Sequence, residues 1–144
     1  YYNMKELIAS LLLWIGAETN YNVDLVHPEI KMMTQIELEH KFYGHDNTPS
    51  GTLHAFYDPE NDVIYLNSNF DRFNAFDKGI LLHELMHYVQ DLNGVVGTRF
   101  ECMRETELEV YPLQKKYLLE VHGVVFDYDE LYVKLQATCN PNMY

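Results

Sequence analysis

Three residues within the stretch ILLHELMHYVQ, residues 80–90, can do chemistry: His83, Glu84 and His87. On an α-helix, residues four apart lie on one face, so the two imidazoles can converge on one point. Glu84 is rotated about 100° from His83 and can lean over that point without occupying it. Neutral imidazoles at this spacing are typical zinc ligands, and a carboxylate beside a zinc-activated water can accept its proton. The HExxH pattern therefore predicts a hydrolytic zinc site with Glu84 as the general base.

The residues around the motif favour a metal site over a surface helix. The uncharged neighbours are Ile80, Leu81, Leu82, Leu85, Met86, Tyr88 and Val89. A helix with these side chains must be largely buried, and burying two imidazoles and a carboxylate without partners is costly. The alternative is a buried polar network that holds no metal, which would fold normally after treatment with a chelator.

Catalytic zinc sites commonly use three protein ligands and keep one position open, so a third ligand is expected. The pattern HExxHxxGxxH is excluded, because Gln90 and Asn93 stand where it requires Gly and His. The inverted motif HxxEH does not occur in the sequence. The remaining common solution is a glutamate on a following helix.

A helix predicted over residues 99–121 offers four candidates for this ligand: Glu101, Glu105, Glu107 and Glu109. At 100° per residue, the side chains within about 60° of Glu107 are mostly apolar. They are Met103, Val110, Tyr111, Gln114, Leu118 and Val121. Glu105 and Glu109 fall on the far side, where we expect a solvated charged face. A lone carboxylate in the inward stripe needs a partner, so Glu107 is the predicted third ligand.

The periodicity of the whole chain predicts an α+β fold in one domain, residues 1–144. The expected elements are helices at 3–19 and 34–44, a strand at 29–34, a hairpin at 52–67, and helices from 71–77 to 92, 99–121 and 127–138. Thr34 and Glu37 have the spacing of a capping box, and DPEN is a strong turn signal. Both faces of the hairpin are apolar, so at least one of its strands should lie inside a sheet. Pro112 can kink or end the helix that carries it.

The sequence has HELMH followed twenty residues later by ELEVY, and this pattern resembles that of the gluzincin zinc metallopeptidases. The short chain is similar to their minimal single-domain (minigluzincin-like) form, which includes uncharacterised bacterial families. The resemblance implies a zincin-like fold, with helices packed on a small mixed sheet, an HExxH active-site helix and a following glutamate helix. It implies one Zn²⁺ per chain, held by His83, His87 and Glu107. It also implies an endopeptidase whose zinc-activated water attacks a peptide carbonyl, with Glu84 as base and then acid.

The resemblance raises two further questions about the site. Val110 and Tyr111 stand where gluzincins often carry Ala and Asp, so the usual carboxylate behind the ligands is in doubt. A further donor normally stabilises the oxyanion, and the candidates are His54, His122, Tyr111 and Tyr132. A sheet edge strand in gluzincins pairs with the substrate backbone, and either VIYLN or LHAFY can take that place.

The alternative function is a catalytically inactive module that uses the same cleft to hold or regulate a peptide. In that case zinc is structural or vestigial. Glu84 favours catalysis, because a purely structural site would not need it. The expected partner is a peptide or protein substrate, and we expect the chain to be a monomer.

Composition excludes some other partners. The net charge is −12, which disfavours nucleic acid because phosphate binding needs a basic surface. The apolar run 7–17 is too short to span a bilayer and is predicted to be a buried helix, so no membrane insertion is expected. Cys102 and Cys139 form either a disulfide or two buried thiols. A disulfide would place the protein in a secreted or periplasmic compartment, with a cytoplasmic location as the alternative.

Overall fold

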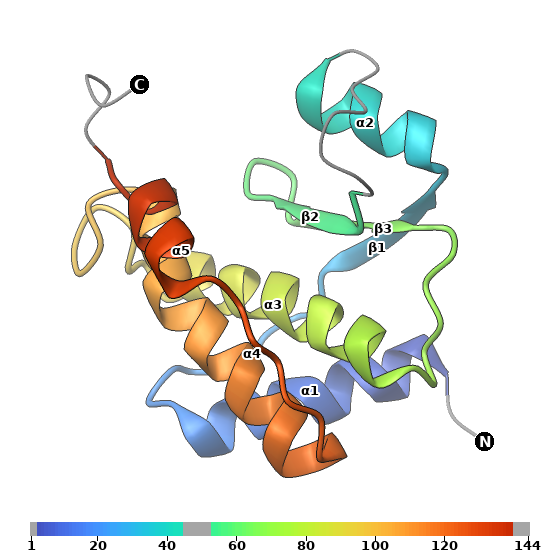
Figure 1. Ribbon diagram of the computed structural model, residues 1–144, viewed down its shortest axis with the longest axis horizontal. Coiled ribbons are helices and arrows are strands. Elements are labelled where there is room, and N and C mark those ends of the chain that lie inside the picture. The colour runs from blue at the N-terminus through green and yellow to red at the C-terminus, as the bar shows by residue number, and fades with distance from the viewer. Residues whose placement is uncertain (1–2, 45–52, 140–144) are drawn as a thin grey trace.

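The structure, a computed structural model, describes residues 3–44 and 53–139 (Figure 1). Within these residues there are five α-helices and a three-stranded mixed sheet, which confirms the α+β class. The elements are α1 (Met4–Glu18), β1 (Glu29–Met33), α2 (Gln35–Tyr43), β2 (Ala55–Asp58), β3 (Val63–Asn67), α3 (Ala75–Leu92), the 3₁₀ helix η1 (Met103–Thr106), α4 (Glu107–His122) and α5 (Glu130–Gln136). None of the described helices combines the length and apolar character that crossing a bilayer requires.

The sheet has the strand order β1-β3-β2, with β1 parallel and β2 antiparallel to β3. The predicted hairpin is confirmed as β2 and β3, and the expected interior strand is β3, whose five residues are all buried. Its two faces meet different partners. Ile64 and Leu66 join the main core, while Val63 and Tyr65 pack with Leu38 of α2. In the strand order of the described residues, β2 is an edge strand that pairs with β3 alone.

Helix α3 lies between the sheet and α1, and α4 packs across it (Figure 1). The predicted helix at the N-terminus is confirmed as α1. Its apolar stripe is buried at Leu7, Ile8, Leu11, Leu12 and Ile15, because helical spacing puts these residues on one face. Three sides of α3 are thus covered by other elements, which explains why its motif is surrounded by apolar residues.

Local sequence signals set the ends of α2 and α3. Thr34 and Glu37 form the predicted capping box of α2, and Gly44 ends it in the left-handed region with φ of 85°. The side chain of Asn74 caps the N-terminus of α3 by accepting a hydrogen bond from the Asp77 N–H. The start of α3 at Ala75 falls within the predicted range.

Two helix boundaries differ from the sequence prediction. The helix expected over 99–121 begins later: Cys102 is extended, Met103–Thr106 is a 3₁₀ turn, and α4 starts at Glu107. The preceding segment is held by tertiary contacts, because Phe100 forms a bridge with Val96 and Cys102 is bonded to Cys139. The helix expected over 127–138 is shorter, Glu130–Gln136, since Asp129 caps it. Pro112 does not end α4.

Candidate metal centre

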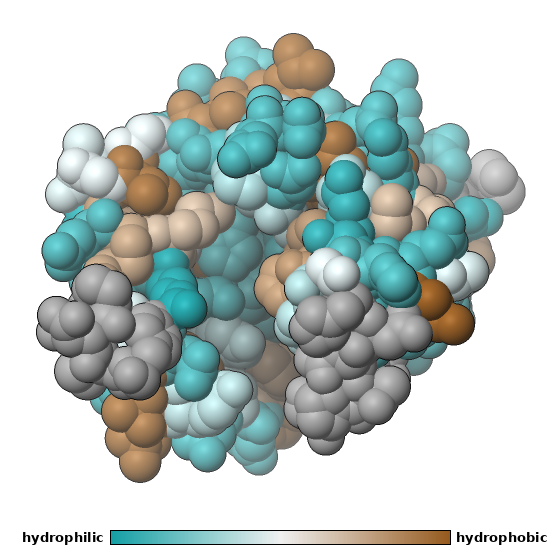
Figure 2. Space-filling model, turned by 90° about the horizontal axis from the view of Figure 1, so that it is seen from above, coloured by the Kyte–Doolittle hydropathy of each residue, from teal (hydrophilic) through white to brown (hydrophobic). Residues whose placement is uncertain are grey.

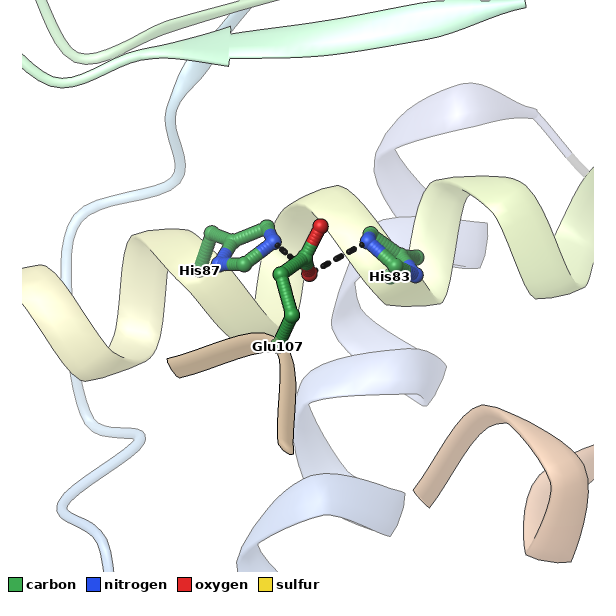
Figure 3. Close-up of side chains that lie close together, drawn as sticks. All are labelled: His83, His87 and Glu107. Atoms are coloured by element: carbon green, nitrogen blue, oxygen red, sulfur yellow. Dashed lines mark ion pairs between the residues drawn. The ribbon is translucent and has the colours of Figure 1, made fainter. Parts of the chain in front are cut away.

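Helix α3 carries the two motif histidines on one face, and both are buried at 8% exposure. His83 and His87 are one turn apart, so their rings point the same way. Glu107, the first residue of α4, reaches between them (Figure 3). Its Oε1 lies 2.9 Å from Nε2 of His83 and 2.6 Å from Nε2 of His87. The structure thus brings together the three residues that the sequence singled out.

The predicted orientation of α4 is largely confirmed. Val110, Gln114 and Leu118 are buried as the helical-wheel argument requires, and they hold the helix with Glu107 toward α3. Val121 was expected to face inward but is 48% exposed. It lies in the last turn of α4, next to the Gly123 cap, where α4 is no longer covered on that side.

Both histidines present Nδ1 to a glutamine. His83 Nδ1 lies 2.8 Å from Gln114 Oε1, and His87 Nδ1 lies 3.2 Å from Gln90 Oε1. An amide oxygen only accepts hydrogen bonds, so each Nδ1 carries the proton when the ring is neutral. Each Nε2 then has its lone pair directed at the Glu107 carboxylate. Three electron-pair donors that converge on one point can share a bound cation; without one, a proton on an imidazole Nε2 takes that place.

These residues fit a zinc ion. Within the described residues, the buried Glu107 Oε1 has no polar partner other than the two imidazole nitrogens. The ligand atoms of the three side chains all lie within 4.8 Å of one another. Tetrahedral ligands with bonds of about 2.0–2.1 Å are separated by roughly 3.3 Å, so zinc would need the carboxylate to move outward by about half an ångström. Two imidazoles and one carboxylate are a donor set that zinc accepts readily.

The electrostatics also favour positive charge at this point. Burial opposes a charged imidazole, but the Glu107 carboxylate, the charge of Glu84 and the hydrogen bond with Gln114 together outweigh it and raise the pKa of His83 to about 9. Burial likewise opposes ionisation of Glu107, yet the two imidazoles hold the pKa of this carboxyl well below its usual range. The carboxylate is therefore ionised at neutral pH and available as a ligand.

Glu84 lies beside this centre and faces β2. Burial raises the pKa of its carboxyl above the ordinary value, while the imidazoles of His83 and His87 and the backbone N–H of Tyr57 oppose the shift. Glu84 does not belong to the group of three converging ligand atoms. Its carboxylate is thus near both imidazoles but is not one of the three converging donors.

Two hollows meet at the candidate centre, and both are lined by Ala55, His83 and Glu84. One has a volume of about 530 Å³ and extends past Ile80 and Phe126. The other has a volume of about 650 Å³ and extends toward α2 and η1. Together they form a groove along β2, and Figure 2 shows the face seen from above hollowed near its centre. His83 and Glu84 lie where the two hollows join.

The four candidates for an oxyanion donor have different places. Tyr111 lines the smaller of these hollows, and its ring packs edge-on against His83 with centroids 4.8 Å apart. Burial, with the charges of Glu107 and Glu84, raises the pKa of Tyr111 to about 12. His54 lines the same hollow.

The other two candidates do not line these hollows, although Tyr132 is near enough to Tyr111 for its charge to affect the pKa of that hydroxyl. His122 is the last residue of α4, whereas Glu107 is the first, so the whole length of the helix separates them. The Nε2 of His122 lies 3.0 Å from the Tyr117 hydroxyl. Tyr132 is 60% exposed on α5. Neither residue lines the two hollows beside Glu84.

Three polar residues near the centre were missed or misjudged from sequence. Gln114 was placed in the inward stripe without a role, and Gln90 served only to exclude another motif. Glu109 was expected on a solvated face, but its carboxylate accepts hydrogen bonds from Tyr21, Gln90 and Arg99 at 2.5, 2.9 and 2.6 Å. The sequence spacing could have predicted the contact between His87 and Gln90, because residues three apart on a helix are neighbours.

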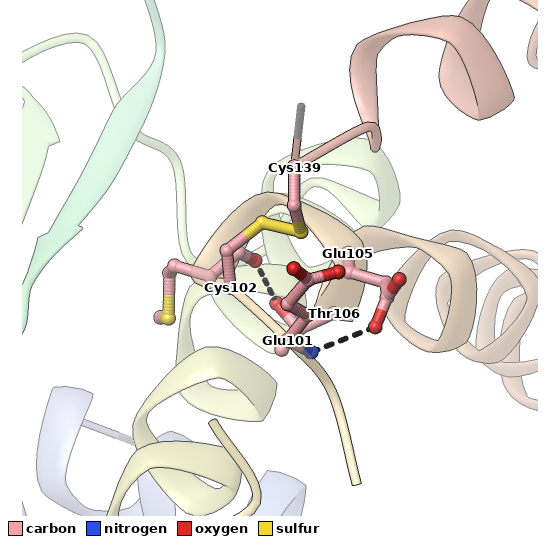
Figure 4. Close-up of a disulfide and its surroundings, with 6 residues drawn as sticks. Glu101, Cys102, Glu105, Thr106 and Cys139 are labelled. Carbon is pink, nitrogen blue, oxygen red and sulfur yellow. Dashed lines mark hydrogen bonds between the residues drawn. A yellow bond between two sulfur atoms is a disulfide. The ribbon is translucent and has the colours of Figure 1, made fainter. Parts of the chain in front are cut away.

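The two cysteines are joined, with their Cα atoms 5.8 Å apart (Figure 4). The bond connects the segment after α5 to the residue that precedes η1, and η1 leads directly into Glu107. Met103 and Arg104 of η1 and Gln136 of α5 line the larger hollow beside Glu84. The disulfide therefore ties together two segments that form one wall of the groove.

Comparison with protein families gives one result. The model of a family described as a domain of unknown function, DUF6647, matches residues 2–144. The chain belongs to this family. No curated protein and no solved structure gives a significant match to this DUF6647 chain. The family description names no activity, so the function has to be argued from the site.

Proposed function

We propose that this DUF6647 protein is a zinc-dependent metallopeptidase of gluzincin type with a zincin-like fold. The observation that carries the proposal is the convergence of His83 Nε2, His87 Nε2 and Glu107 Oε1 beside Glu84 in a groove along an edge strand. One Zn²⁺ per chain would be held by those three side chains. When bound, zinc supplies a Lewis acid that activates water and polarises the peptide carbonyl.

Glu84 is the general base and then the general acid in this proposal. Its carboxyl has a raised pKa, which brings it closer to the range in which a carboxylate accepts a proton and gives it back at neutral pH. It takes the proton of the attacking water and passes it to the nitrogen of the leaving amine. The imidazoles of His83 and His87 and the N–H of Tyr57 counteract part of this burial effect and so favour the ionised form of the base.

Strand β2 provides backbone groups that can align an extended peptide. The Asn67 N–H donates to the His54 carbonyl at 2.8 Å, and Phe56 pairs with Tyr65. Antiparallel pairs alternate, so the backbone groups of Ala55 and Tyr57 face away from β3. The Tyr57 N–H meets the Glu84 carboxylate there, which leaves the Tyr57 C=O and the two groups of Ala55 for a peptide. Of the two candidate strands, LHAFY thus has a free edge, whereas VIYLN is the interior strand β3. A substrate would add to β2 by strand pairing.

Tyr111 is the donor that we assign to the oxyanion. Its hydroxyl keeps its proton throughout the neutral range because its pKa is raised to about 12. It also lies in the same hollow as His83 and Glu84, next to where a peptide carbonyl would lie. His54 of the same hollow is the second candidate.

The disulfide supports a location in an oxidising compartment. Cytosolic proteins seldom keep structural disulfides, so we propose that the protein acts outside the cytoplasm, secreted or periplasmic. The net charge of −12 suits peptides that carry basic or neutral residues.

The test begins with elemental mass spectrometry of protein purified without chelators and then incubated with zinc. We expect about one zinc per chain, and hydrolysis of a quenched-fluorescence peptide library that stops when zinc is chelated. Glu84→Gln should lose at least about 100-fold in rate while it retains zinc. Glu120→Gln, on the exposed end of α4, is the control for loss of one carboxylate.

Three outcomes would contradict parts of the proposal. Zinc near zero after incubation removes the metal site. Zinc near one without hydrolysis of any library peptide favours the peptide-binding module instead of the enzyme. Loss of zinc from the Glu84→Gln variant would show that Glu84 is a ligand and not the base.

A further inference from the structure

Gln90 is a fully buried polar side chain at the candidate centre, with 0% exposure. Its Nε2 lies 2.9 Å from Glu109 Oε1 and 3.4 Å from the Thr106 carbonyl. Its Oε1 faces Nδ1 of His87 at 3.2 Å. Both polar atoms of this amide therefore have partners. Nε2 faces two oxygen atoms, and Oε1 faces an imidazole nitrogen.

The partners of Nε2 determine which way the amide lies. A carboxylate and a carbonyl can only accept hydrogen bonds, so the NH₂ group must face Glu109 and Thr106. The amide oxygen then must face His87. Thr106 Oγ1 lies 3.3 Å from the same Nδ1 and donates its own proton to the Met103 carbonyl, so it too offers a lone pair. Both atoms beside His87 Nδ1 are acceptors.

Glu109 is itself held in place by two further residues. Tyr21, from the segment after α1, donates to its Oε1 at 2.5 Å. Arg99 donates to its Oε2 at 2.6 Å and to the Tyr21 hydroxyl at 2.7 Å. The side chain of Glu109 is only 21% exposed. A charge-assisted network thus fixes the carboxylate that fixes the amide.

We propose that Glu109 and Gln90 are positioning residues that hold His87 with its proton on Nδ1 and its Nε2 lone pair free for the metal. This inference rests on the proposed zinc site. It gives the two glutamates of ELE different tasks: Glu107 is a ligand, and Glu109 sets the tautomer of a ligand from the opposite side of α4. It also answers what replaces the carboxylate that gluzincins often carry behind their ligands, since here an amide backed by a carboxylate does so for His87.

The test measures the zinc Kd by competition with a chromophoric chelator. Removal of the acceptor for Nδ1 by Gln90→Leu should weaken zinc binding about 10- to 100-fold, the range found for groups that orient ligands. Glu109→Leu should weaken it about tenfold, because the amide of Gln90 is then free to turn its NH₂ toward His87. Glu120→Gln should leave the Kd unchanged. The thermal midpoint of each metal-free variant shows whether it still folds.

A charge exchange separates positioning from packing. Gln90→Glu alone places two carboxylates together and should weaken folding and binding. Combined with Glu109→Gln, it restores the hydrogen-bond direction at His87, because the new amide can donate to the new carboxylate, which accepts from His87 Nδ1. The Tyr21 hydroxyl loses its acceptor in this variant, since it shares Glu109 Oε1 with Gln90 in the wild type. We expect the zinc Kd of the double variant to lie within about threefold of the wild-type value. Each single variant should bind zinc more weakly than the double variant does.

The outcomes distinguish this inference from the function on which it rests. A wild-type protein that binds no zinc overturns both. A wild-type protein that binds zinc, with Glu109→Leu folded and equally tight, overturns the positioning inference alone. Failure of the double variant to exceed Gln90→Glu in affinity would also overturn it, because packing and not hydrogen-bond direction would then govern binding.

Discussion

Removal of the disulfide should cost a large share of the stability of this domain. Cys102 and Cys139 are 37 residues apart in sequence, and the loop between them contains α4 and α5. In the chain-entropy treatment, a bridge over this separation restricts the unfolded chain by about 3.9 kcal/mol at 25 °C. Domains of this size unfold with about 5–15 kcal/mol, so the bridge accounts for a quarter or more of the total. We expect the double Cys→Ser variant to lose about 3–4 kcal/mol.

Urea denaturation of the oxidised chain and of the Cys102→Ser/Cys139→Ser variant measures this difference. Far-UV circular dichroism follows the helices, and fluorescence of the single tryptophan, Trp14, follows the contact between α1 and α4. Trp14 packs edge-on against Tyr117 with ring centroids 5.2 Å apart, so it reports on the closed loop. Coincident transitions from the two probes would justify a two-state free energy.

A difference below about 1 kcal/mol between the two proteins would refute the reasoning, because a bridge over this separation should exceed it severalfold. Alkylation of the unfolded wild type before and after reduction, read by mass, first establishes that the bond is present. An equal stability with the bond present would mean that residual structure in the unfolded chain already brings the two ends together.

Two further predictions concern the candidate centre. Glu107→Ala should weaken zinc binding by more than the roughly 100-fold known for residues that only hydrogen-bond to metal ligands, whereas Glu105→Ala should change it little. Equal losses of affinity in a chelator competition assay would mean that Glu107 is not the ligand. Tyr111→Phe should lower kcat about 100- to 1,000-fold with KM and bound zinc nearly unchanged, as for the loss of one oxyanion donor. A kcat equal to wild type would move that role to His54.

Much of the centre could be predicted because local patterns determined it. The spacing of His83 and His87 is fixed by any α-helix, and the apolar residues around them leave no surface alternative. Glu107 could be chosen among four glutamates because Val110 and Leu118 fix which face of α4 is buried. In each case the signal lay within one helix, where geometry depends on sequence spacing alone.

The errors came where distant parts of the chain decide the local environment. Glu109 lies on the far side of α4 as predicted, but Tyr21 and Arg99 from other segments cover that side and make it part of the site. Residues 99–102 were expected to be helical, yet Phe100 forms a bridge with Val96 and Cys102 is bonded to Cys139. The parallel pairing of β1 with β3 joins residues more than thirty positions apart, which no local pattern reveals.

The position of β2 has a consequence for how the protein behaves at high concentration. An unpaired strand edge is a template on which other chains can add strands, and proteins usually blunt such edges to avoid aggregation. Here the edge is four residues long and lies inside the groove, with Tyr111 and Phe126 lining one hollow beside it and Met103 the other. We expect these flanking side chains to hinder the approach of a second folded sheet more than that of a single extended chain. The recess would then oppose self-association of the protein through its own sheet.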